Sequence, residues 1–333
     1  CYAGLTPWFD ARQEGDAAVS PRGVDPFVNA TIYYGNPNGW GERRMQRLPA
    51  PRCTSVAAGD FTGDGRPDLA FLCADAFSPS AVKKVRLFYH SDLGFEPRRY
   101  VDLDIDADQL GAGDLDGDGF AELLIRSDNG EITVYWGAPD GIDPSRCTAL
   151  PTSGERVEDA VSELDKASNE YIQDAKPLVQ IIQVDGQPHI FVALVGRALL
   201  VPVDSDRHFL QPLTFACAQP MAAAVGDVNG NGHQDLVFAC REPNGEQESE
   251  QSWIYWGNGN AFSEQRRTSL PTYRACDVAL GDLDGDGRDD IVICHGYTSD
   301  WNTRDSLLFR GGTEIGEPVG LTSHDGRRVF VAR

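Results

Sequence analysis

Four short stretches of this sequence place acidic and amide side chains at alternate positions, a spacing suited to binding a hard cation. They follow the pattern D-x-D-x-D-G-x-x-D and are named here loop 1 (60–68), loop 2 (114–122), loop 3 (227–235) and loop 4 (282–290). Side chains at positions 1, 3 and 5 of such a loop converge, and glycine at position 6 permits the sharp bend. Oxygen ligands in this number suit Ca²⁺, whereas Mg²⁺ prefers a smaller octahedron and Zn²⁺ prefers Cys or His.

We predict five ligand positions in each loop, giving about four calcium sites. The predicted ligands are Asp60, Thr62, Asp64, Arg66 and Asp68; Asp114, Asp116, Asp118, Phe120 and Glu122; Asp227, Asn229, Asn231, His233 and Asp235; and Asp282, Asp284, Asp286, Arg288 and Asp290. The residue at position 7 would contribute only its main-chain carbonyl. Loop 3 has the fewest carboxylates and is predicted to bind most weakly, so calorimetry that found it the tightest site would contradict this ranking. In loop 4, Asp289 is expected to point away from the ion as ordinary surface.

Each loop joins two apolar runs that are typical of β-strands. The hairpins span 56–72, 110–126, 223–239 and 278–294, and a strand–turn–strand element follows each at a variable distance. Together they make a four-stranded unit of roughly 50 residues, and even repetition of such units is typical of a β-propeller. Aromatic residues recur in the third strands, where packing between neighbouring blades is favoured over stacking on sugars. They are Tyr33, Tyr34, Phe88, Tyr89, Tyr135, Trp136, Tyr255 and Trp256.

One unit, at 177–204, keeps its strands but has no acidic loop. Asp185-Gly186 is expected to form a plain two-residue hairpin turn there. The charged segment before it, at about 152–176, is interpreted as an insertion.

The sequence thus predicts an all-β fold, with residues 1–333 forming a single β-propeller domain of four-stranded blades. Six blades are preferred, with residues 329–333 completing the N-terminal blade and closing the ring, because closure removes free sheet edges. The alternative is a seven-bladed ring in which residues 1–10 supply a first strand.

The acidic hairpins, such as "GDLDGDGRDDIVIC" at 281–294, resemble FG-GAP/VCBS repeats of integrin α-subunit propellers and of many secreted bacterial proteins. The "YWG" element that follows two of the hairpins also resembles bacterial members. The resemblance implies a calcium-binding propeller, usually seven-bladed, that serves adhesion, ligand binding or assembly. The six-blade count and the unit without a loop depart from that pattern.

Six of the eight cysteines recur in register, one before the first strand and one at the end of the second strand of a hairpin. This placement predicts disulfides Cys53–Cys73, Cys217–Cys240 and Cys276–Cys294, at the hairpin end opposite the acidic loop. Cys1 and Cys147 remain. The alternatives are that they pair with each other, that Cys1 bonds to a group outside this chain, or, as the weaker option, that Cys1 is lipidated. Paired cysteines indicate an oxidising compartment.

The formal net charge of −22 argues against nucleic acid and anionic membranes as partners. No run of 18 apolar residues is present, so no transmembrane segment is predicted. The chain opens at Cys1, which suggests a processed product. A glycosylation sequon lies at 29–31, and two long polar loops, 241–252 and 295–305, are either solvated or contact a partner.

No G-x-S-x-G, H-E-x-x-H or Walker motif is present, and the protein is predicted not to be an enzyme. The favoured function is a secreted or cell-surface calcium-binding propeller that acts as an extracellular binding, adhesion or assembly module, with a protein or glycan ligand. The alternatives are a glycan-binding lectin and, less favoured, a calcium-dependent carbohydrate-active enzyme such as a polysaccharide lyase.

Overall fold

The computed structural model describes most of the chain, in eleven ranges. These are 30–34, 45–51, 53–74, 83–127, 130–151, 179–194, 196–217, 219–241, 251–259, 262–295 and 305–322. Several predictions lie outside them: the fate of Cys1, the strand at 329–333, the insertion at about 152–176, the sequon residue Asn29, and most of the two polar loops. The chain divides into two compact units, Cys1–Thr152 and Ser153–Arg333.

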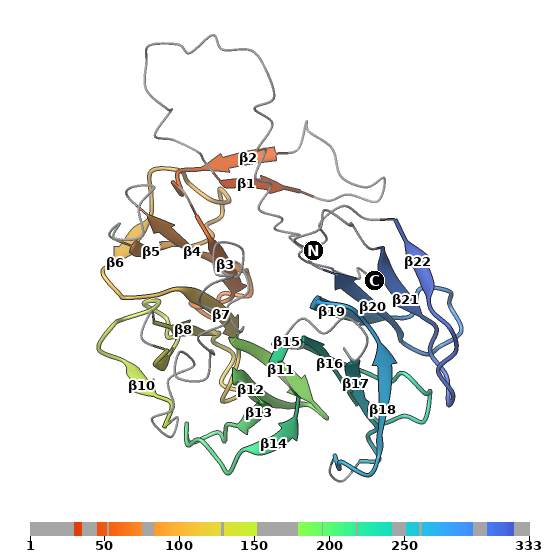
Figure 1. Cartoon of the computed structure of the whole chain (residues 1–333). Coiled ribbons are helices and arrows are strands. Elements are labelled where there is room, and N and C mark those ends of the chain that lie inside the picture. Colours follow the sequence, from red (N-terminus) through yellow and green to blue (C-terminus); the bar gives the residue numbers. More distant parts are fainter. Residues whose placement is uncertain are drawn as a thin grey trace, which may run out of the picture. The chain divides into compact units, whose positions relative to one another are not determined.

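Every regular element among the described residues is a β-strand, so the predicted all-β class is confirmed. The strands form six antiparallel sheets, of which the first has two strands in the described ranges and the others have four. Within each sheet the strands follow one another in chain order, as Figure 1 shows. Six up-and-down sheets of this kind are consistent with the blades of a propeller, and a count of six fits.

The first unit contains three of these sheets. Their strands are β1 (Ala30–Tyr33) and β2 (Met45–Leu48); β3 (Ser55–Gly59), β4 (Asp68–Ala74), β5 (Lys83–Phe88) and β6 (Val101–Leu103); and β7 (Gln109–Gly113), β8 (Glu122–Arg126), β9 (Ile132–Tyr135) and β10 (Cys147–Ala149).

The second unit contains the other three sheets. Their strands are β11 (Val179–Val184), β12 (Gln187–Leu194), β13 (Arg197–Pro202) and β14 (Leu213–Ala216); β15 (Gln219–Gly226), β16 (Asp235–Arg241), β17 (Gln251–Tyr255) and β18 (Arg267–Pro271); and β19 (Ala275–Gly281), β20 (Asp290–His295), β21 (Ser306–Phe309) and β22 (Val319–Leu321).

The second strand of each four-stranded sheet is its most buried element. In β4, β8, β16 and β20 almost every residue is buried, and in each of these strands the first residue, a carboxylate, is followed by a short apolar run. Such a run forms a strand that is covered on both faces. The covers are neighbouring sheets: one hydrophobic cluster combines β3–β6 with β7–β10, and another combines β15–β18 with β19–β22. The fourth strands β10 and β22 are exposed along their whole length.

Aromatic residues of the third strands pack between sheets, as predicted, for example at the end of β17. Tyr255 contacts Phe215 of β14 edge to face, with ring centroids 4.9 Å apart. The next residue, Trp256, packs against the cluster shared with β19–β22. Because side chains alternate along a strand, two successive aromatic residues reach the two neighbouring sheets.

The turn between β11 and β12 is the plain two-residue hairpin that the sequence predicts. Val184 pairs with Gln187, and the two turn residues Asp185 and Gly186 have φ of 49° and 76°. Both central residues of a type I′ turn need positive φ, which Asp-Gly accommodates.

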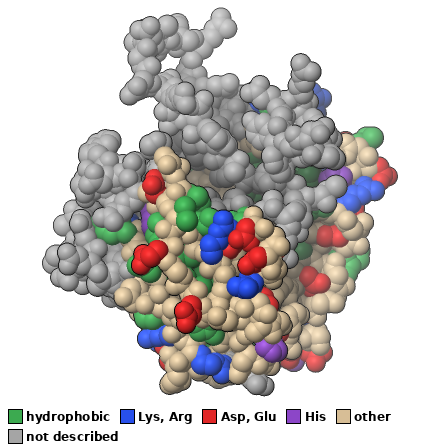
Figure 2. All heavy atoms as spheres, turned by 90° about the vertical axis from the view of Figure 1, so that its right-hand side faces the viewer, with side chains coloured by type: hydrophobic (Ala, Val, Ile, Leu, Met, Phe, Trp, Pro, Cys, Tyr) green, Lys and Arg blue, Asp and Glu red, His purple; other side chains and the backbone are tan. Residues whose placement is uncertain are grey.

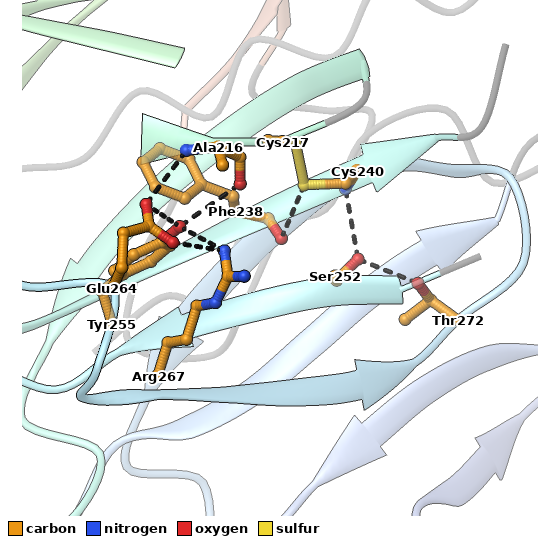
Figure 3. The surroundings of a disulfide bond; sticks show 9 residues. All are labelled: Ala216, Cys217, Phe238, Cys240, Ser252, Tyr255, Glu264, Arg267 and Thr272. Carbon is orange, nitrogen blue, oxygen red and sulfur yellow. Dashed lines mark hydrogen bonds and ion pairs between the residues drawn. A yellow bond between two sulfur atoms is a disulfide. The ribbon is translucent and has the colours of Figure 1, made fainter. Parts of the chain in front are cut away.

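The predicted disulfide Cys217–Cys240 is present (Figure 3) and lies at the hairpin end opposite loop 3. Beside it, the carboxylate of Glu264 accepts the main-chain N–H of Ala216 at 3.1 Å and the hydroxyl of Tyr255 at 3.0 Å. Burial raises the pKa of Tyr255 to about 12, so the phenol stays protonated and donates. The disulfide and this network together attach the end of β14 to the sheet β15–β18.

The other two predicted hairpin disulfides are not formed in the structure. Cys53 and Cys73 are thiols that pack in one hydrophobic cluster. The Sγ of Cys276 donates to the main-chain carbonyl of Cys294 at 3.4 Å. Cys276 lies at a register shift between Ala275 and Asp277, and a bulge of this kind changes the direction of a side chain. One of the three register-matched pairs is therefore confirmed, and Cys147, the predicted partner of Cys1, is an exposed thiol.

Candidate metal-binding loops

The four acidic loops are the turns between the first and second strands of their sheets, as the sequence predicts. Loop 1 joins β3 to β4, loop 2 joins β7 to β8, loop 3 joins β15 to β16, and loop 4 joins β19 to β20. In each loop the glycines at positions 4 and 6 both have positive φ, for example 81° at Gly285 and 87° at Gly287. Residues with a Cβ rarely adopt this conformation, so the backbone itself requires these glycines.

The first residue of each loop folds its carboxylate back over the turn. In loop 4, Asp282 accepts the N–H of Gly285 at 2.7 Å with one oxygen and that of Gly287 at 3.0 Å with the other. Asp227 of loop 3 accepts the N–H of Gly230 and Gly232 in the same way, both at 2.8 Å. These bonds hold the loop's first carboxylate at a fixed place.

The carboxylate at position 9 is buried and joins the first hairpin to the segment after the third strand. Asp235 accepts the N–H of Val228 at 3.0 Å with one oxygen and the N–H of Gly257 at 2.8 Å with the other. Asp68 in loop 1 and Asp290 in loop 4 have equivalent partners. Burial is the largest cause that raises the pKa of Asp68 and of Asp235 to about 6.

Glu122 makes position 9 of loop 2 different. Its Oε2 accepts the N–H of Leu115 at 2.6 Å, but its Oε1 is buried without a hydrogen-bond partner. The side chain is fully buried, and this burial, followed by repulsion from Asp116 and Asp114, raises the pKa of Glu122 to about 8. Carboxylate oxygens of Asp114, Asp116 and Glu122 lie within 4.8 Å of one another. A hard dication fits this donor set, because it would satisfy Oε1 and offset the repulsion.

Loop 4 contains the other group of converging carboxylates, from Asp282, Asp284 and Asp286, again within 4.8 Å of one another. An arginine that is not among the predicted site residues also lies at this loop. Nη1 of Arg310 lies 2.8 Å from a carboxylate oxygen of Asp290 and 3.3 Å from one of Asp284. Arg310 follows the third strand β21, at the place where the other three repeats with an acidic loop have an aromatic residue, and this departure was the available signal.

Loops 1 and 3 offer fewer carboxylates. In loop 1, the hydroxyl of Thr62 donates to Asp68 at 3.4 Å. In loop 3, the amide of Asn229 donates to Asp235 at 3.2 Å, and the amide oxygen of Asn231 accepts the N–H of His233 at 2.8 Å. The loop 3 amides therefore occupy the positions predicted for ligands and are already hydrogen-bonded within the turn.

Side chains at position 7 reach segments outside their own loops, although Arg288 also lies 3.9 Å from a carboxylate oxygen of Asp286 in its own loop. Arg66 pairs with Asp92 at 2.6 Å. Phe120 of loop 2 lies against Gly63 of loop 1, where an added Cβ would meet the ring at 2.5 Å. Arg288 of loop 4 covers Gly230 of loop 3 in the same manner. Successive loops therefore touch within each unit.

The prediction that Asp289 is ordinary surface is wrong. Its side chain is buried, with a relative exposure of 8 %. Its Oδ2 accepts the main-chain N–H of Asp227 at 3.0 Å, and its own N–H donates to the Asp227 carbonyl at 2.9 Å. The local spacing predicts that Asp289 points away from the ion of its own loop. Its side chain is instead covered by loop 3 of the neighbouring sheet, where its partner Asp227 lies 62 residues away in sequence.

The fold and these loops define an all-β protein of repeated four-stranded sheets with acidic first turns. Family models agree with the predicted resemblance: the FG-GAP repeat model matches residues 107–135, and the FG-GAP-like repeat model matches residues 227–293. The first match contains loop 2, and the second spans loops 3 and 4. The chain therefore contains FG-GAP repeats, and the family resemblance is confirmed.

Solved structures with a similar chain course include a protein of unknown function from Bacteroides caccae, at 14 % identity and a TM-score of 0.45. That match covers 89 % of this chain and 92 % of the other. A mutant of AofleA from Arthrobotrys oligospora is similar at 12 % identity and a TM-score of 0.48, covering 90 % of this chain and 86 % of the other. No curated protein matches the chain in sequence.

The described surface carries both acidic and basic side chains. On the face drawn in Figure 2, acidic and basic side chains are interspersed rather than gathered into one patch. Among the described residues, no helix is long and apolar enough to cross a membrane. The disulfide is consistent with an oxidising or extracellular compartment.

Proposed function

We propose that this protein is a secreted, calcium-binding β-propeller that acts as an extracellular binding, adhesion or assembly module. FG-GAP repeats suggest such a module, and proteins of this family are generally not enzymes. The observation that carries the calcium proposal is loop 2, where three carboxylates converge and the buried Oε1 of Glu122 has no hydrogen-bond partner.

The proposed ions have a structural role. Asp114, Asp116, Asp118 and Glu122 would hold the ion of loop 2, and the corresponding side chains would do so in the other loops. A bound dication neutralises carboxylates that otherwise repel one another at the end of a hairpin. The ion would then stabilise one end of the hairpin, while in the sheet β15–β18 the disulfide stabilises the other.

Isothermal titration calorimetry of metal-stripped protein with Ca²⁺ tests the proposal. We expect saturable binding at several sites and the loss of one site in the variant Asp114→Asn/Asp116→Asn. A matched control is Asp140→Asn/Asp143→Asn, which neutralises two carboxylates that pair with Arg146 and are not predicted ligands. Absence of Ca²⁺ binding to the wild-type protein would refute the calcium part of the proposal.

A glycan array probed with and without a calcium chelator distinguishes a glycan-binding lectin from a protein-binding module. Binding to one class of glycan, lost on chelation, would favour the lectin alternative over a protein-binding module. Absence of glycan binding, together with calcium binding by calorimetry, would favour a protein ligand.

We further propose that the six sheets are blades of one ring closed by residues 329–333. The residue at position 2 of loops 1 and 3, Phe61 and Val228, is fully buried under the following sheet, whereas Leu283 of loop 4 is 46 % exposed. No described sheet follows β22, so a blade completed by residues 329–333 would cover Leu283. Deletion of residues 329–333 should then lower the free energy of unfolding, and an unchanged urea midpoint would refute closure.

A further inference from the structure

We propose that Asp289 of loop 4 is a positioning residue for loop 3, so that these two loops bind their ions as a coupled pair. The inference rests on the proposed calcium binding and adds a residue outside the ligand pattern. Asp289 lies directly before Asp290, the last predicted ligand of loop 4, yet its Oδ2 and its main-chain N–H both bond to Asp227 of loop 3.

The contact involves both the main-chain N–H and the main-chain carbonyl of Asp227. Asp289 Oδ2 accepts the N–H of Asp227 at 3.0 Å, and the N–H of Asp289 donates to the carbonyl of Asp227 at 2.9 Å. Asp227 is the first predicted ligand of loop 3, and its carboxylate in turn accepts the N–H of Gly230 and Gly232. Fixing the backbone of one residue costs conformational entropy, so a contact that fixes Asp227 in advance favours ion binding.

The absence of a side chain at Gly226 leaves room for the Asp289 carboxylate. A Cβ added at Gly226 would lie 2.4 Å from Asp289 Oδ2, so only glycine permits the approach. The hollow beside the contact is lined by Asp227, Asp282, Gly287 and Asp289, which places the first ligands of loops 3 and 4 at one cavity.

In two other repeats the residue at position 8 also hydrogen-bonds to the first turn of the preceding sheet, but through different groups. Gln234 of loop 3 accepts the N–H of Asp185, the first residue of the preceding plain turn, at 2.6 Å. Ala121 of loop 2 donates its N–H to the carbonyl of Asp60 at 2.7 Å but has no side-chain acceptor. Asp289 is thus the only one of these three described residues that joins two acidic loops through both a main-chain and a side-chain bond.

The N–H groups of Gly232 and Gly287 report on the two loops separately, because each donates to its own loop's first carboxylate. The experiment is a Ca²⁺ titration of the full chain, selectively labelled with ¹⁵N-glycine and followed by NMR. The measured quantity is the ratio of the half-saturating Ca²⁺ concentration at Gly232 to that at Gly287.

In Asp289→Ala we expect this ratio to rise about tenfold, as loss of one buried hydrogen bond would produce. Asp289→Asn keeps an acceptor oxygen but removes the charge, so the ratio should stay within about twofold of wild type. Asp206→Ala, which removes an exposed carboxylate in the same unit, should leave the ratio unchanged. If Asp289→Ala does not fold, Asp289→Ser, whose hydroxyl is too short to reach Asp227, takes its place with the same expectation.

An unchanged ratio in the Ala or Ser variant would overturn the inference while leaving the calcium proposal intact. An equal rise in Asp289→Asn would also overturn it, because charge rather than positioning would then be responsible. A wild-type protein whose glycine signals do not respond to Ca²⁺ would overturn both proposals.

Discussion

At the scale of single residues, the carboxylate at position 9 of each acidic loop has a structural role in addition to its predicted role as a metal ligand. Asp68, Asp235 and Asp290 are buried and accept main-chain N–H groups from two different segments of their sheets. Glu122 is longer by one methylene and leaves an oxygen without a partner. A buried polar atom without a partner is costly, so the Glu122 side chain should be especially sensitive to pH and to bound cations.

The first prediction concerns the pH dependence of the ion-free protein. Burial raises the pKa of Glu122 to about 8, so between its ordinary pKa and this value the folded state binds more protons than the unfolded chain. The free energy of unfolding must therefore fall as the pH rises through that window. Urea unfolding of metal-stripped protein should show a fall of roughly 3 to 4 kcal/mol between pH 5 and pH 8 from this group.

Glu122→Gln should remove the part of the fall that comes from Glu122, because the amide does not titrate. The smaller parts that come from Asp68 and Asp235, whose pKa values are raised to about 6, should remain. Asp118→Asn, which neutralises an exposed carboxylate in the same loop, should keep it. A wild-type protein that gains stability over the same pH range would show that Glu122 is not the controlling group.

The second prediction concerns Arg310, whose guanidinium occupies the side of loop 4 where Asp284 and Asp290 lie. A bound dication has to compete with this charge. Arg310→Ala should therefore tighten Ca²⁺ binding at loop 4 by about three- to tenfold, measured at the Gly287 amide. Arg99→Ala, at an exposed arginine paired with Glu96, serves as the control. Weaker binding in Arg310→Ala would mean that the arginine supports the loop rather than competing with the ion.

At the scale of elements, the hairpin β15–β16 is fastened at both ends. The disulfide Cys217–Cys240 closes a segment with a sequence separation of 23 residues, and Asp235 anchors loop 3 at the other end. The Glu264–Tyr255 network beside the disulfide joins this hairpin's sheet to β14 (Figure 3). Loss of the disulfide should therefore destabilise both the sheet β15–β18 and the sheet that contains β14.

The third prediction is that Cys217→Ala/Cys240→Ala lowers the free energy of unfolding by about 3 kcal/mol, as expected for a closed segment of this length. Equilibrium urea unfolding measures the change. Cys147→Ala removes an exposed thiol and should change the stability by less than about 0.5 kcal/mol. Equal stability of the double variant and the wild type would show that the network around Glu264 alone holds the joint.

At the scale of the whole molecule, the net charge of −22 opposes folding through repulsion between carboxylates. Cations bound only by the folded state would offset this repulsion and stabilise the protein by mass action. The stability of the whole chain should therefore depend on the calcium concentration.

The fourth prediction is that Ca²⁺ at about a hundred times its dissociation constant raises the Tm of metal-stripped protein by at least about 5 °C, since each filled site contributes about 2.7 kcal/mol. Mg²⁺ at the same concentration should give less than half of the shift, because it dehydrates reluctantly and demands a tighter octahedron. Differential scanning calorimetry at fixed ionic strength measures both shifts. Equal shifts for the two ions would indicate charge screening rather than ligation.

The sequence by itself determined the repeating part of this protein. Local pattern was sufficient for features that depend on residues close together in the chain: strand and turn positions, the glycines of the acidic loops, the Asp185-Gly186 hairpin and the FG-GAP resemblance. It was not sufficient for the cysteines, because the same placement predicts three disulfides and the structure forms only Cys217–Cys240 of them. Tertiary structure alone decided that Asp289 is buried against Asp227, and that Arg310 lies beside Asp284 and Asp290. These contacts join residues 20 to 62 positions apart, and strand periodicity does not encode which side chain a neighbouring sheet or strand will meet.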